Sequence, residues 1–186
     1  IDVLVGDYES CVKYNRKAIA ADQHAMLRNP LTAGKESFYF GYIVHDYHMA
    51  IYGAILGGME AMAMSVSQEL NEILTEEMFA ELPDLVSYLE GYSAMEVHTM
   101  VRFGRWDQLL QVPLPKDENL MLFRTASIRF GRALALAMSG HVDEAKAEAD
   151  ILDKLMEHPE ADFRILHNNS VKRLLEGMGS QLDATG

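Results

Sequence analysis

Three histidines are the residues of this chain whose type and spacing could do chemistry. His45 and His48 are three residues apart and so share one face of a helix, and His98 could join them if the segments that carry these residues stack. Imidazoles in this arrangement could ligate zinc, which usually also needs a supporting carboxylate. The nearest one, Asp46, points roughly 100° away from His45 around a helix. We therefore predict no metal ligands and no cofactor.

Other catalytic patterns are missing from the sequence. There is no Gly-x-Ser-x-Gly, no phosphate-binding loop ending in Lys-Ser/Thr and no His-Glu-x-x-His. The adjacent acids Glu76 and Glu77 diverge on a helix, unlike a general-acid pair. Packing accounts for Cys11 without any chemistry. We predict no catalytic residues and no enzyme; a small-molecule or metal-dependent enzyme with a histidine-lined groove stays as the alternative.

The charge of the chain is concentrated in one segment. The 186 residues carry a net charge of −12, and residues 36–101 contain no lysine or arginine but eleven carboxylates. Such a field repels nucleic acid and attracts basic partners, so we predict a basic protein or peptide partner and no nucleic acid. A solvated helix face that keeps the protein soluble is the simpler reading of the same charges.

The single cysteine and the apolar stretch at 38–58 bear on location. One cysteine permits no internal disulfide and suits a reducing compartment, so we expect a cytoplasmic protein. The stretch at 38–58 is long enough to span a membrane, but His45, Asp46 and His48 would lie near mid-bilayer at a high cost. We therefore expect no membrane partner.

Helical periodicity extends over almost the whole chain. Long stretches rich in Ala, Leu, Met and Glu recur, and sustained alternation of apolar and polar residues is absent. The fold class is predicted to be all-α, with short loops that make consecutive helices antiparallel hairpins. The expected helices cover residues 7–27, 37–56, 59–74, 84–103, 105–111, 119–139, 141–157 and 162–178.

Four glycines mark a repeated turn. Each is followed five residues later by a small or apolar residue, and the pairs are Gly6–Cys11, Gly58–Ala63, Gly104–Leu109 and Gly140–Ala145. A glycine can close one helix in the left-handed conformation, and the small residue lets the next helix pack closely against the first. The pattern predicts four helix–turn–helix units.

This pattern resembles the tetratricopeptide repeat family, most closely around Gly6 to Ala18 and Ala133 to Ala145. The glycine spacings of 52, 46 and 36 residues exceed the usual repeat of about 34, so linkers or extra turns would separate the units. The resemblance implies an α–α superhelix, a solenoid of antiparallel hairpins, that forms a single domain over residues 1–186. Because the first unit lacks most of its first helix, we expect a fragment of a longer repeat protein.

The resemblance also implies a binding groove. The first helix of each such unit lines a concave surface, and the matching positions here are His45, His48 and Tyr52 in the second unit and His98 in the third, with Arg102 one turn further on. We therefore predict a protein–protein interaction scaffold that binds a peptide or partner helix at these five residues. The alternative is that the three histidines are packing residues of the core.

Overall fold

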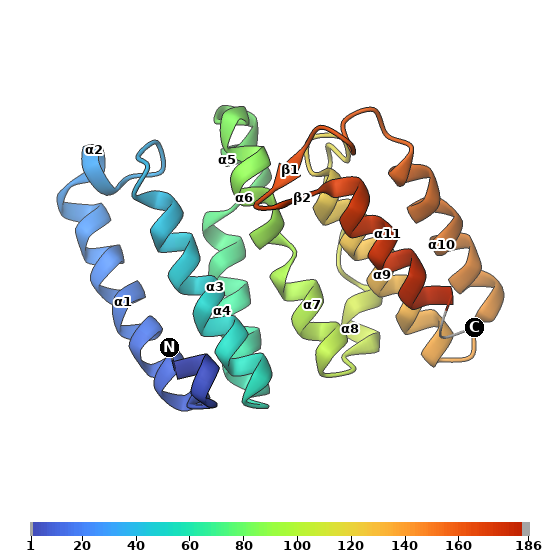
Figure 1. Cartoon of the computed structure of the whole chain (residues 1–186), viewed down its shortest axis with the longest axis horizontal. Coiled ribbons are helices and arrows are strands. Elements are labelled where there is room, and N and C mark those ends of the chain that lie inside the picture. The colour runs from blue at the N-terminus through green and yellow to red at the C-terminus, as the bar shows by residue number, and fades with distance from the viewer. Residues whose placement is uncertain (1, 184–186) are drawn as a thin grey trace. The chain divides into compact units, whose positions relative to one another are not determined.

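A computed structural model describes residues 2–183 of the chain. These residues are predominantly helical, which confirms the all-α class, and a single short β-hairpin pairs β1 (Ile165–Leu166) with β2 (Asn169–Ser170) among them (Figure 1). The chain divides into two compact units, residues 1–73 and 74–186. The superhelical arrangement of a solenoid stays a prediction, as does the single repeat domain.

The first unit is a set of helices packed in chain order. It contains a short 3₁₀ helix η1 (Asp2–Val5) and the helices α1 (Tyr8–Arg28), α2 (Pro30–Ala33), α3 (Phe40–Leu56) and α4 (Glu60–Ile73). The middle helix α3 packs against α1 on one side and α4 on the other. Buried side chains of all three helices form the core, among them Val12, Ile19, Ile43, Val44, Tyr47, Ile51, Val66 and Leu70.

Cys11 lies at a close contact between α1 and α3. Its side chain is 3% exposed, and a Cβ atom added to Gly53 of α3 would lie 2.9 Å from its sulfur. The thiol points to the carbonyl oxygen of Met49 at 3.5 Å. The small residues at both positions therefore set the spacing of the two helices, in agreement with the packing role predicted for Cys11.

The four predicted turn glycines have the expected backbone. Gly6, Gly58, Gly104 and Gly140 have φ values of 79°, 70°, 65° and 82°, a region that residues with a Cβ rarely adopt. Each lies between two helical elements, so each ends one element and starts the next. The left-handed conformation predicted for these four glycines is confirmed.

The second unit is built around the long helix α9 (Leu122–Met138). Helices α6 (Val86–Ser93), α7 (Met95–Arg102), α8 (Trp106–Leu110), α10 (Val142–Met156) and α11 (Val171–Asp183) all contact α9. Helix α5 (Glu76–Glu81) and the 3₁₀ helix η2 (Pro83–Leu85) precede them. The core under α9 includes Leu122, Phe123, Ala126, Phe130, Leu152, Leu166, Val171 and Leu175.

Two predicted helices of this unit differ from the structure. The helix expected at 84–103 is interrupted at Ala94, because the Ser93 carbonyl accepts a hydrogen bond from the Arg124 guanidinium. The helix expected at 162–178 starts only at Val171. The β-hairpin precedes it, and its turn holds His167 at a φ of 56°. The hairpin thus occupies part of the range for which the sequence predicts a helix.

No helix among residues 2–183 combines the length and the apolar character needed to cross a bilayer.

Candidate functional site

One side of α3 carries a row of aromatic and imidazole rings, here called the α3 face: Tyr42, His45, His48 and Tyr52. The ring centroids of His45 and His48 are 6.2 Å apart, and those of His48 and Tyr52 are 6.1 Å apart with ring planes 18° from parallel. Tyr42 and Tyr52 are 57% and 42% exposed, His45 is exposed, and His48 is half-buried. The α3 face is therefore open to solvent over most of its rings within the first unit.

The helical period explains why these rings point outward. The residues that alternate with the rings along the sequence are buried against α1 and α4, namely Ile43, Val44, Tyr47 and Ile51. Their burial turns the opposite side of α3 to the surface. Tyr47 is fixed further, since the Gln23 amide of α1 lies 2.9 Å from its hydroxyl oxygen. The core thus determines the orientation of the α3 face.

A pair of aspartates joins α1 and α3. Asp22 of α1 is 6% exposed and accepts a hydrogen bond of 2.8 Å from the Tyr39 hydroxyl. Asp46 of α3 is within hydrogen-bonding reach of Asp22. Burial first, and then the neighbouring Asp22, raise the pKa of Asp46 to about 6, while His45 acts in the opposite direction.

The sequence does not reveal this aspartate pair, and it indicates for Asp46 only a possible support of His45. Residues 22 and 46 lie on different helices, so their proximity depends on how α1 packs against α3. The pair places negative charge beside the α3 face whenever Asp46 is ionised. Two neighbouring carboxyl groups can also share one proton.

The remaining predicted site residues belong to the second unit. His98 of α7 is half-buried, and burial lowers its pKa, so the neutral imidazole is favoured at neutral pH. Arg102 is exposed, with its guanidinium carbon 5.7 Å from the ring centroid of Phe103. The structure thus brings His45, His48 and Tyr52 together on one helix, and the shared groove with His98 and Arg102 stays a prediction.

A buried ion pair organises the second unit. Glu90 of α6 is fully buried, and its carboxylate accepts hydrogen bonds from the backbone N–H groups of Phe123 and Arg124 at the start of α9 and from Arg164 at 2.9 Å. Burial raises the pKa of Glu90, and Arg164 and the two N–H groups oppose that rise. The same carboxylate therefore caps the N-terminus of α9 and, through Arg164, anchors the segment before the β-hairpin.

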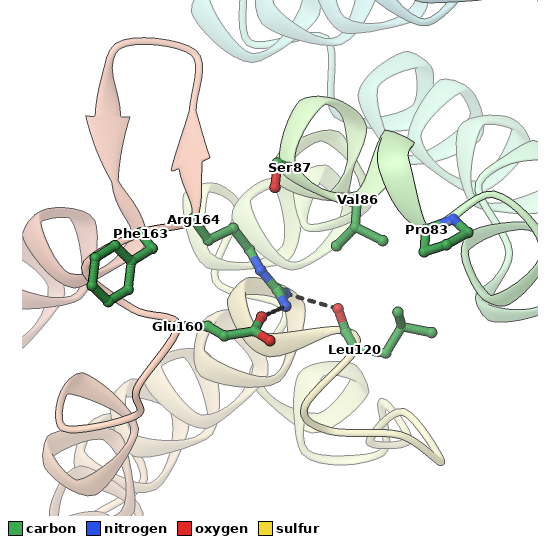
Figure 2. Close-up of a pocket in the computed structure, with 7 residues that line it drawn as sticks. All are labelled: Pro83, Val86, Ser87, Leu120, Glu160, Phe163 and Arg164. Carbon is green, nitrogen blue, oxygen red and sulfur yellow. Dashed lines mark hydrogen bonds and ion pairs between the residues drawn. The ribbon is translucent and has the colours of Figure 1, made fainter.

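A pocket of about 310 Å³ opens beside this ion pair (Figure 2). Its lining comes from η2 and α6, from the loop before α9 and from the turn after α10, and consists of Pro83, Val86, Ser87, Leu120, Glu160, Phe163 and Arg164. Most of its side chains are apolar, and one cation and one carboxylate meet at its wall. The volume is in the range of small-molecule sites.

Among the residues that the structure describes, no group of three or more histidine, cysteine or acidic side chains is arranged to hold a metal ion. Comparisons of the chain with family models, with curated proteins and with solved structures found no match.

Proposed function

We propose that the first unit is a protein-interaction module that binds a basic peptide segment along the α3 face. The observation that carries this proposal is the set of rings on one helix side: His45, His48 and Tyr52 lie in sequence with neighbouring centroids 6.2 and 6.1 Å apart, and the exposed ring of Tyr42 lies on the same side. Exposed aromatic rings are typical of interface anchors, and they are uncommon on a surface that contacts only water.

The chemistry of the face favours a cationic ligand. Tyrosine rings attract lysine and arginine side chains through their π-faces, at about 0.5–2 kcal/mol for each contact. Asp46 and Asp22 add negative charge beside the rings, and residues 36–101 contain no lysine or arginine to oppose it. The same preference is present within the chain, since the amino groups of Lys13 and Lys17 lie 5.8 and 5.7 Å from the ring centroid of Tyr14.

The length of the face suits a short segment. Tyr42 and Tyr52 are ten residues apart on a helix, which corresponds to about 15 Å. An extended peptide covers that distance with about four or five residues. A ligand with arginine or lysine at alternate positions could therefore contact two or three rings at once.

Two further parts of the proposal concern the parent architecture and the location. The turn glycines at positive φ support helix–turn–helix repeats of the tetratricopeptide type, and we propose that the hairpins assemble into such a solenoid. The single buried thiol suits a reducing environment, and we propose a cytoplasmic location.

The test is fluorescence anisotropy of a labelled peptide that alternates glycine and arginine, with the matching glycine–glutamate peptide as the comparison. We expect the arginine peptide alone to bind, and its affinity to fall as salt is added. The double variant Tyr42→Ala, Tyr52→Ala should bind about tenfold more weakly, since two cation–π contacts are lost.

The matched control is Tyr14→Ala, which removes an exposed tyrosine of the same unit from α1 instead of α3. This control should bind the arginine peptide like the unchanged chain. Equal binding of the two peptides, or a double variant with unchanged affinity and helicity, would contradict the proposal.

A further inference from the structure

The pocket beside Arg164 is independent of the α3 face and lies wholly in the second unit. Arg164 is 8% exposed, and four of the five donors of its guanidinium are used. One terminal nitrogen donates to Glu90 at 2.9 Å and to the Leu120 carbonyl at 2.8 Å. The other donates to the Asn119 carbonyl at 3.2 Å and to the carboxylate of Glu160.

These four acceptors are not equally fixed. Glu90 is fully buried and held by two backbone N–H groups, and the carbonyls of Asn119 and Leu120 belong to the main chain. Glu160 is different, because its side chain is 58% exposed and lies in the turn after α10. It is therefore the one of these partners that can leave the guanidinium without unfolding its surroundings.

The charges around Arg164 indicate which kind of ligand could replace Glu160. Arg164 and Glu90 already form a neutral pair, so Glu160 adds a second negative charge that the guanidinium holds at the pocket wall. A ligand with one carboxylate could take that position with no change in net charge. Planar carboxylates match the fork of a guanidinium, whereas a dianion would leave one charge without a partner.

The rest of the pocket is suited to an apolar group. Pro83, Val86 and Phe163 line it, and Phe163 is 85% exposed although its ring is apolar. Figure 2 shows Phe163 on one side of Arg164 and Val86 with Pro83 on the other. A ligand held at the guanidinium would lie between these walls and could cover part of the exposed ring.

We infer that this pocket binds a small apolar monocarboxylate, whose carboxylate displaces Glu160 from Arg164. Glu160 then acts as a built-in competitor that occupies the guanidinium in the empty pocket. Both a free organic acid and the C-terminal residue of a peptide have this chemistry, and the volume of about 310 Å³ favours the free acid.

The test follows backbone amide signals of the full chain by NMR during titration with phenylacetate, with neutral phenylacetamide as the comparison. We expect saturable shifts at Ser87 and Arg164 with phenylacetate only. Glu160→Ala should bind phenylacetate about tenfold more tightly, because the competing carboxylate is removed. Glu157→Ala, which removes an exposed glutamate outside the pocket lining, should leave the affinity unchanged.

Four results would overturn the inference. The first is equal shifts with the acid and the amide, and the second is a Glu160→Ala variant, folded by its melting curve, whose affinity is not raised. The third is binding of a peptide that ends in a free phenylalanine carboxylate while phenylacetate does not bind. Ser87→Trp, which fills the pocket from α6, should abolish the shifts, and persistent binding there would also contradict the assignment.

Discussion

Arg164 donates a hydrogen bond of 2.9 Å to the carboxylate of Glu90, a residue 74 positions earlier in the chain. Both side chains are buried, and the same carboxylate accepts two N–H groups at the start of α9. The pair therefore connects α6, α9 and the segment before the β-hairpin through one charged centre. Removal of one partner leaves the other charge buried and unpaired.

Glu90→Ala should lower the free energy of unfolding of the second unit by about 3–5 kcal/mol, because Arg164 loses its buried partner and α9 loses its cap. Urea denaturation followed by circular dichroism measures this. The matched control is Lys172→Ala, which breaks the exposed 3.1 Å ion pair with Asp162 and should cost at most about 1 kcal/mol. Similar losses in the two variants would contradict a central role for the buried pair.

The aspartate pair of the first unit predicts a pH-dependent stability. The native pKa of Asp46 is about 6 and its ordinary value is 3.8, so the folded state holds the proton more tightly than the unfolded state. Protonated Asp46 therefore contributes to the free energy of unfolding in full below about pH 4, and this contribution is lost as the pH rises through about 6. Since Asp46 is partly exposed, we expect a loss on the order of 1 kcal/mol.

The measurement compares the free energies of unfolding of the unchanged chain and Asp46→Asn from pH 4 to pH 7. Asparagine mimics the protonated carboxyl and can donate to Asp22, so the variant should be the more stable one at pH 7 and nearly equal to the unchanged chain at pH 4. Glu36→Gln, at an exposed position of the same unit, should show no such pH-dependent difference. A difference that is constant with pH would argue against the shared proton.

Local features of the fold could be predicted from the sequence. Glycine adopts a positive φ far more readily than other residues, so the four turns could be predicted from the residue type alone. All four turn glycines have a positive φ. The exposure of His45 and Tyr52 agrees with the helical period, since the apolar residues Ile43, Val44 and Ile51 of the same helix are buried. Both features depend only on residues that are neighbours in the chain.

Features made by distant residues could not be predicted in this way. The break at Ala94 depends on Arg124, which takes the Ser93 carbonyl from another helix, and the late start of α11 accompanies the anchoring of Arg164 by Glu90. The charge count of the sequence treats Glu90 as one more surface acid, although it is fully buried. No spacing rule marks such a pair, since its members lie in separate elements.

The thiol of Cys11 should react slowly in the folded protein. Burial raises its pKa and its side chain is 3% exposed, so both the thiolate population and the access of a reagent are reduced. With Ellman's reagent at pH 8 we expect a rate at least about a hundredfold below that of the urea-unfolded chain. A rate near the unfolded value would show that the contact between α1 and α3 opens easily.

The close approach of Gly53 to Cys11 predicts opposite effects of the same substitution at two helical glycines. A Cβ at Gly53 would lie 2.9 Å from the Cys11 sulfur and 3.4 Å from a methyl group of Val12, so Gly53→Ala should destabilise the first unit by about 1–2 kcal/mol. At Gly177 of α11 the added Cβ meets no atom within 4 Å, and Gly177→Ala should stabilise the second unit by about 0.5–1 kcal/mol.

Thermal unfolding of the two variants measures both effects, and the Cys11 reaction rate provides a second readout for the first. Gly53→Ala should speed that reaction, whereas Gly177→Ala should leave it unchanged, because the loosened contact lies only between α1 and α3. The double variant Gly53→Ala, Cys11→Ala should regain part of the lost stability, since the sulfur that the new methyl group meets is gone. If Gly53→Ala instead raises the melting temperature as a helix-favouring residue does, glycine is not required for the close packing of α1 on α3.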